Sequence, residues 1–190
     1  MVVDSDSVGD PARFRTREDL ELALQALPIA PTDRGSVALV VSRGAGGRRE
    51  TPDRVRLTGD GGMPGDKWSL REDRKIDGQI TVMQLAVATL IANGQPLTLF
   101  GDNLFVDLDL SVGNLPTGSR VRIGSAVLEV TPKPHNGCRK FRARFGDEAL
   151  RLVNKPELRH RNLRGIYLCV VGDGGVGRGD AVEVIRRGWS

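Results

Sequence analysis

The feature that most constrains the fold is a series of short apolar runs separated by turn residues. Within residues 96–131 these runs are four to eight residues long, and glycine, proline, asparagine or aspartate stands between them. Closely spaced short runs of this kind are typical of β-strands in barrels and sandwiches, and Gly124-Ser125 is placed to join two of them as a hairpin. Further strand-like runs occur at 36–43, 54–58, 165–172 and 180–187. The sequence therefore predicts a mainly β fold, a closed or nearly closed β-barrel with a few flanking helices.

Helical signals occur in three places. Thr16 is a suitable N-cap, acidic residues follow it in the first turn, and Pro28 ends the leucine periodicity that comes after. Residues 81–94 combine a capping-box pattern at Thr81 with continuous apolar character, and residues 147–154 predict a shorter helix. We expect residues 1–30 to form an N-terminal flexible arm and helix, and residues 31–190 to form a single barrel domain.

Composition excludes several classes of protein. A length of 190 residues suits one domain, and no run approaches the roughly 18 apolar residues of a membrane span. The first residues lack a signal peptide's apolar segment, and two cysteines do not make a disulfide framework, so a cytoplasmic protein is expected. The positive charge is concentrated, because residues 133–164 hold ten Lys or Arg against three Asp or Glu. Such a field attracts anionic ligands.

Cys138 lies in the middle of this basic segment. It follows a proline-rich stretch and Asn136-Gly137, which predicts an exposed loop at the end of a strand. Neighbouring cations, Arg139 and Lys140 among them, favour a thiolate, which is both a nucleophile and a ligand for soft metals. A zinc site with the two histidines, a catalytic Cys-His pair and an incidental exposed cysteine remain alternatives, with His135 expected to be a solvated loop residue. Cys169, by contrast, lies in a strand and is expected to be a buried structural residue.

Glycine-aspartate pairs recur along the chain. Gly65-Asp66, Gly101-Asp102-Asn103 and Gly179-Asp180 match no Walker or dinucleotide fingerprint, and each reads equally well as an ordinary turn. Arg164 opens a predicted strand, so it is expected either at the barrel rim, pointing at an anion, or as a simple edge arginine.

Together these segments resemble the MOSC domain, named for the C-terminal domain of molybdenum-cofactor sulfurase. The resemblance runs in order along residues 35–187, and no single motif carries it alone. Its parts are GSVALVVSR, the turn GMPGDKW, the stretch GDNL with aspartate where glutamate is usual, the strand pair from Thr117 to Thr131, the loop cysteine Cys138 followed by Arg139 and Phe141, RGIY, and GGVGRGD. Asn136-Gly137 stands where many reductases of the family carry a proline before the cysteine.

The resemblance implies a molybdenum cofactor, molybdopterin, as ligand. Cys138 would then coordinate molybdenum and act in catalysis. Arg139, Lys140, Arg164 and the turns Gly65-Asp66 and Asp102-Asn103 would hold the anionic pterin. No pyridoxal phosphate is expected, since nothing here resembles the sulfurase's aminotransferase-like half.

Two functional hypotheses follow from the resemblance. The first is an oxidoreductase that reduces N-hydroxylated or related substrates with electrons from an external electron-transfer protein. The second is a non-catalytic carrier of the cofactor or of sulfur, with Cys138 holding a persulfide or delivering metal. A nucleic-acid partner is not expected, because an aromatic content of 4% leaves few stacking platforms. No membrane partner is expected either.

Overall fold

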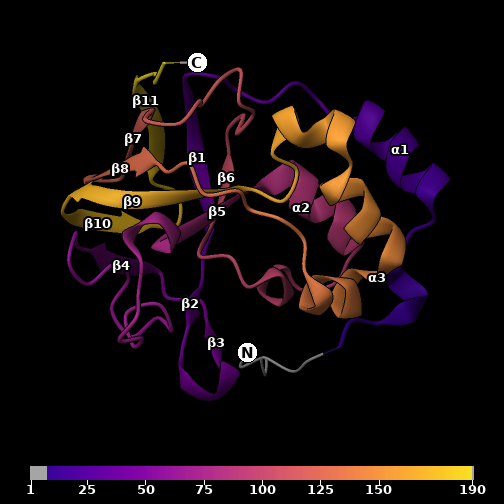
Figure 1. The fold of residues 1–190 in the computed structure, drawn as a ribbon, viewed down its shortest axis with the longest axis horizontal. Coiled ribbons are helices and arrows are strands. Elements are labelled where there is room, and N and C mark those ends of the chain that lie inside the picture. Colours follow the sequence, from indigo (N-terminus) through magenta and orange to yellow (C-terminus); the bar gives the residue numbers. More distant parts are fainter. Residues whose placement is uncertain (1–7, 190) are drawn as a thin grey trace.

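The computed structural model describes residues 8–189, and its centre is a closed barrel of seven strands (Figure 1). The order around the barrel is β1-β11-β7-β8-β9-β5-β6, and β6 pairs back with β1. Neighbouring strands are antiparallel except β5 and β6, which are parallel. The strands are β1 Arg34–Val40, β5 Ile80–Gln84, β6 Leu104–Asp107, β7 Arg120–Ile123, β8 Ala126–Val130, β9 Ile166–Gly172 and β11 Ala181–Arg186. The predicted barrel is thus confirmed.

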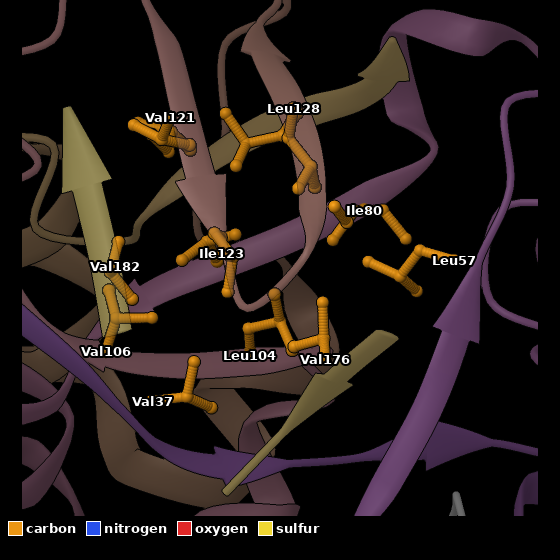
Figure 2. Packing of buried hydrophobic residues seen from close by; sticks show 14 of the residues in the cluster. Val37, Leu57, Ile80, Leu104, Val106, Val121, Ile123, Leu128, Val176 and Val182 are labelled. Carbon is orange, nitrogen blue, oxygen red and sulfur yellow. The ribbon is translucent and has the colours of Figure 1, made fainter. Parts of the chain in front are cut away.

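Aliphatic side chains fill the barrel. Because side chains alternate along a strand, every second residue points inward, and these residues form one buried cluster. Figure 2 shows part of it, with Val37, Leu104, Val106, Val121, Ile123, Leu128 and Val182 directed into the same space. Complete burial of one such side chain stabilises the fold by about 1.5–3 kcal/mol, so the barrel is a rigid platform for whatever lies at its rim.

Three helices lie together on one side of the barrel (Figure 1): α1 Arg17–Gln25, α2 Leu85–Ala92 and α3 Arg139–Asn154. They cover a second core, to which the barrel strands contribute Met83 and Phe105. Phe145 of α3 stacks on Phe100 with ring centroids 4.1 Å apart. Strand β1 has apolar side chains on both faces, since Val37 and Val40 belong to the barrel core while Leu39 packs against the second core.

Short elements complete the fold. Two small antiparallel pairs lie beside the barrel: β2 Ser42–Arg43 with β3 Arg49–Glu50, and β4 Arg54–Leu57 with β10 Gly174–Gly177. The 3-10 turns are η1 Pro11–Arg13, η2 Ala45–Gly47, η3 Ile76–Gly78, η4 Leu97–Phe100 and η5 Pro156–Arg161. Strand β10 lies in the glycine-rich segment between β9 and β11. Glycine is uncommon in strands. It is needed in β10 because a Cβ on Gly174 would lie 2.3 Å from the backbone of Ser125.

Local signals were accurate where one short-range interaction decides the structure. The Asp19 amide donates to Thr16 Oγ1 over 3.2 Å, as expected of an N-cap. The predicted hairpin is also present, since Ile123 pairs with Ala126 across Gly124-Ser125 and Gly124 has a φ of 58°.

Three local predictions were wrong. The helix expected from Thr81 begins at Leu85, because residues 80–84 form β5 and the Thr81 hydroxyl bonds to Asn103 instead of capping a helix. The expected strand at 97–100 is the 3-10 turn η4, which Gly101 ends with a φ of 77°. The helix expected from residue 147 begins at Arg139 as α3, interrupted at Gly146, where φ is 89°.

The residues before α1 are docked against the helices. The Gly9 amide donates to Ala143 O over 3.1 Å, and Arg15 Nε donates to Leu90 O over 3.1 Å. The expectation of a flexible arm is therefore wrong for residues 8–15, while residues 1–7 lie outside the described part of the chain. A domain boundary at residue 30 stays a prediction. Within residues 8–189, no helix has the length and apolar character needed to cross a membrane.

Candidate functional site

Cys138 is exposed and stands directly before α3, at the end of the irregular segment that follows β8. The preceding turn is fixed by the second half of α3. The Gly137 amide donates to Asn154 Oδ1 over 2.9 Å, and a Cβ on Gly137 would lie 2.7 Å from Leu150 Cδ1. A side chain at position 137 would therefore press against α3, whereas the glycine turn packs closely there and places the thiol at the edge of a pocket.

This first pocket has a volume of about 470 Å³, within the usual range for small-molecule sites. Cys138 contributes to one wall, and the glycine-rich turn between β2 and β3 forms another. Two largely buried aromatic residues, Phe100 and Phe141, add apolar lining. Among the described residues its lining includes no acidic side chain but six basic ones, Arg43, Arg49, Lys67, Lys140, Arg144 and Arg164. The pocket is therefore suited to an anionic ligand.

Arg43 reaches the pocket from β2 because Asp66 holds it from behind. Its Nη2 lies 2.7 Å from Asp66 Oδ1 and its Nε lies 2.8 Å from Oδ2, with both side chains buried. Burial alone would raise the pKa of Asp66, but the hydrogen bonds and charge of Arg43 outweigh it and lower that pKa. Asn103 donates to the same carboxylate over 3.0 Å and so ties two motifs together.

Arg164 is held in the same way by Asp102, with Nη1 2.6 Å from Oδ2. Burial raises the pKa of the Asp102 carboxyl, and the Arg164 charge opposes that rise. His135 is a nearly buried part of the pocket lining, its Nε2 3.7 Å from Asp102 Oδ1 and its ring centroid 4.5 Å from that of Tyr167. Burial, followed by the charges of Arg164 and Arg43, lowers the pKa of His135 well below its usual 6.5, so this ring is neutral.

Burial and the charges of neighbouring cations lower the pKa values of two further basic side chains, Lys67 and Arg49. Partial burial in the pocket wall, together with Arg43 and Arg49, lowers the pKa of Lys67 to about 8, although the side chain keeps contact with solvent. Burial and the charges of Arg144 and Arg43 likewise lower the pKa of Arg49. An anion bound between these groups would relieve their mutual repulsion.

The structure brings together only part of the predicted site. Cys138, Lys140 and Arg164 line the first pocket, whereas Arg139 is exposed and does not. Gly65 is an exposed turn residue with a φ of 74°. The three polar residues of the motifs, Asp66, Asp102 and Asn103, are buried behind the wall, where they orient arginines.

Four basic lining residues were absent from the predicted site: Arg43, Arg49, Lys67 and Arg144. Three of them adjoin sequence features that carry a signal. The stretch RGAGGRR places Arg43 and Arg49 on either side of a glycine-rich turn, and Lys67 directly follows the Gly65-Asp66 motif.

Two other expectations about histidine and cysteine need correction. His135 is not a solvated loop residue, since its side chain is 7% exposed. Cys169 is half-buried on the outer face of β9, not fully buried. The zinc alternative also fails, because no group of three or more His, Cys, Asp or Glu within residues 8–189 is arranged to hold a metal ion.

The chain matches a known protein family. The model of the MOSC domain family matches residues 83–183. This chain belongs to the MOSC domain family. The matched region runs from β5 to β11 and includes Cys138, Lys140 and Arg164 of the pocket. MOSC domains are associated with the molybdenum cofactor.

Solved structures show the same MOSC barrel at low sequence identity. A hypothetical protein of known crystal structure gives a TM-score of 0.58 at 23% identity, covering 81% of this chain and 69% of its own. YiiM from Escherichia coli gives 0.55 at 21% identity, covering 82% and 72%. YuaD from Bacillus subtilis gives 0.53 at 19% identity, covering 80% and 95%. These likenesses establish the fold alone, and a search of curated proteins finds no match.

Proposed function

We propose that this MOSC protein binds a molybdenum cofactor in the first pocket and uses it to reduce N-hydroxylated or related compounds. The observation that carries the proposal is the convergence of Cys138 with six basic side chains on one pocket beside the barrel. A thiolate is a soft ligand suited to a metal such as molybdenum, and the cations suit a phosphorylated pterin.

The pocket's donor set fits that cofactor. Among residues 8–189, His135 Nδ1 and Arg164 Nε are buried without a hydrogen-bond partner, and both residues line the pocket. Buried polar atoms of this kind are rare unless a ligand or water satisfies them.

Each group in the wall has a separate task under this proposal. Cys138 ligates the metal, and Lys140 and Arg164 bind the anionic parts of the cofactor, with Arg164 oriented by Asp102. When bound, the cofactor supplies a redox centre that exchanges electrons with donor and substrate. Reduction breaks the N–O bond of the substrate, and with two electrons and two protons it yields the amine and water. The electrons come from an external electron-transfer protein, and Cys138 must stay reduced, as in a reducing cytoplasm.

Metal analysis tests the proposal. The full chain is purified from a host that makes the cofactor, and molybdenum per protein is measured by mass spectrometry. We expect Cys138→Ala to lower the molybdenum content at least about tenfold, because a direct ligand matters no less than the outer-shell groups whose loss costs that much. Cys169→Ala, which removes the other thiol, is the matched control and should keep its molybdenum. Wild-type protein without molybdenum, or equal content in Cys138→Ala, would contradict the proposal.

The exposure of Cys138 favours a second candidate, a carrier of sulfur or cofactor. An accessible thiol at a pocket edge can take up a sulfur atom from a persulfide donor and pass it on. Intact-mass measurement distinguishes the two functions. One added sulfur on the wild type and none on Cys138→Ala, together with absence of bound molybdenum, would support the carrier.

A further inference from the structure

A second pocket, of about 270 Å³, adjoins the first. The two share Arg43, Lys67, Thr81 and Tyr167, so these side chains form a common wall. The remaining lining comes from the segment 68–78 and from Lys133, the latter on the stretch between β8 and Cys138. No part of the function proposed above uses this pocket.

The second pocket carries uncompensated positive charge. Three of its cations are paired: Arg43 with Asp66, Arg71 with Asp73, and Lys133 with Asp77. Three others, Lys67, Arg74 and Lys75, have no ion pair with any described residue. A surplus of three positive charges around so small a volume favours a multiply charged anion over a single carboxylate.

The pocket is also built in advance of any ligand. Trp68 is buried, and its indole Nε1 donates to Lys75 O over 2.9 Å, which closes the loop on itself. The Arg74 guanidinium lies over the Trp68 ring at 5.7 Å from its centroid, while Lys133 lies 5.3 Å from the Tyr167 centroid. Aromatic faces thus hold two cations in place, which reduces the entropy lost when an anion binds.

We propose that the second pocket binds the phosphoryl group of a phosphorylated small-molecule substrate. The role as a substrate site rests on the function proposed above, since the reducible end of the molecule would extend past the common wall toward Cys138. Phosphate matches the site because it carries about two negative charges and three strong acceptor oxygens, which arginine and lysine donors satisfy. The cofactor's own anionic group would occupy the first pocket. Beside the shared Arg43 and Lys67, each anion then has cations of its own, Lys140 and Arg164 in the first pocket and Arg74 and Lys75 in the second.

Trp68 provides a direct probe of binding. The chain has two tryptophans, and Trp189 is 96% exposed, so Trp189→Phe leaves Trp68 as the one reporter. Inorganic pyrophosphate is titrated into this full-length variant while its emission is recorded. We expect a saturable change, and about tenfold weaker binding when Lys75→Ala or Arg74→Ala removes one charged donor. Arg178→Ala, an exposed arginine that lines neither pocket, is the charge-matched control and should bind as before.

Two results would overturn the second site: no saturable response, or a loss of response in Lys140→Ala as large as in Lys75→Ala. The second result would place the anion in the first pocket, because Lys140 lines only that pocket. Molybdenum content, measured on the same proteins, distinguishes a failure of this proposal from a failure of the function proposed above. Pyrophosphate binding without molybdenum in the wild type would support an anion site while refuting its role in the proposed reduction.

Discussion

Substitution of Asp66 by asparagine would test whether the buried ion pair with Arg43 holds the rim of the pocket. The carboxylate accepts five hydrogen bonds, three at Oδ2 and two at Oδ1. Every donor is an N–H group, from Arg43, Trp68 or Asn103. In either orientation, the amide NH₂ of asparagine would therefore face at least two other donors.

The magnitude follows from burial. The Arg43 and Asp66 side chains are 6% and 1% exposed, so neutralising Asp66 leaves a largely buried Arg43 charge without its counter-ion. Breaking a buried pair in this way costs about 3–5 kcal/mol. Because domains are stable by about 5–15 kcal/mol in total, Asp66→Asn should remove a large fraction of the stability.

Urea unfolding followed by tryptophan fluorescence measures this loss. With an m-value of about 2 kcal/mol/M, the midpoint should fall by about 2 M. Asp73→Asn is the matched control, because Asp73 forms a 2.9 Å pair with Arg71 in the same region but both side chains are exposed. A midpoint for Asp66→Asn that equals the control's would refute the assignment of Asp66 as the support of Arg43.

Three further predictions concern pH and backbone geometry. The lowered pKa of Asp66 means that its stabilisation is complete above its ordinary 3.8 and is lost as pH falls through the lower folded-state value, so the Asp66→Asn penalty should shrink in acid. The lowered pKa of His135 means that below 6.5 the unfolded chain takes up a proton that the folded chain refuses. Stability should then fall by up to about 1.4 kcal/mol per pH unit, and His135→Gln should remove that slope in urea titrations at several pH values, with the exposed His160→Gln as control. Gly124→Ala should lower stability by about 1–3 kcal/mol in thermal unfolding, since its Cβ would meet a carbonyl oxygen at 2.4 Å and φ is 58°. Gly118→Ala, also at positive φ but with open space around it, should cost less, and equal losses would contradict the steric reasoning.

The sequence predicted those features that depend on nearby residues or on an ordered set of motifs. The helix cap at Thr16 and the Gly124-Ser125 hairpin each depend on residues within a few positions of one another, so local chemistry decides them. The barrel followed from short alternating runs and from the resemblance to the MOSC domain. Of the candidate site, Cys138 and Lys140 could be identified because the cysteine and the basic cluster are contiguous, and Arg164 because it opens a predicted strand.

The rest depended on contacts between distant parts of the chain. Asp66 and Asp102 looked like ligand-binding turn residues, but each faces away from the pocket, toward an arginine 23 or 62 residues away. His135 looked like a solvated loop residue, yet Tyr167 of β9 and Asp102 enclose it. A single sequence shows which residues are neighbours along the chain, but not which side of a wall their side chains occupy.

The two buried ion pairs explain why acidic residues belong to a site that selects anions. Arg43 and Arg164 share the first pocket with four other basic side chains, and unpaired guanidinium groups so close together would repel one another and turn outward toward water. Asp66 and Asp102 keep the two arginines from turning outward. Each carboxylate lies on the side of its arginine away from the pocket and accepts a hydrogen bond of 2.7 or 2.6 Å, which the ligand does not replace. The Gly-Asp motifs thus act on a bound anion indirectly: they keep two rigid donors aimed into the pocket before the ligand arrives, and they lower the repulsion that the donors would otherwise exert on Arg49 and Lys67.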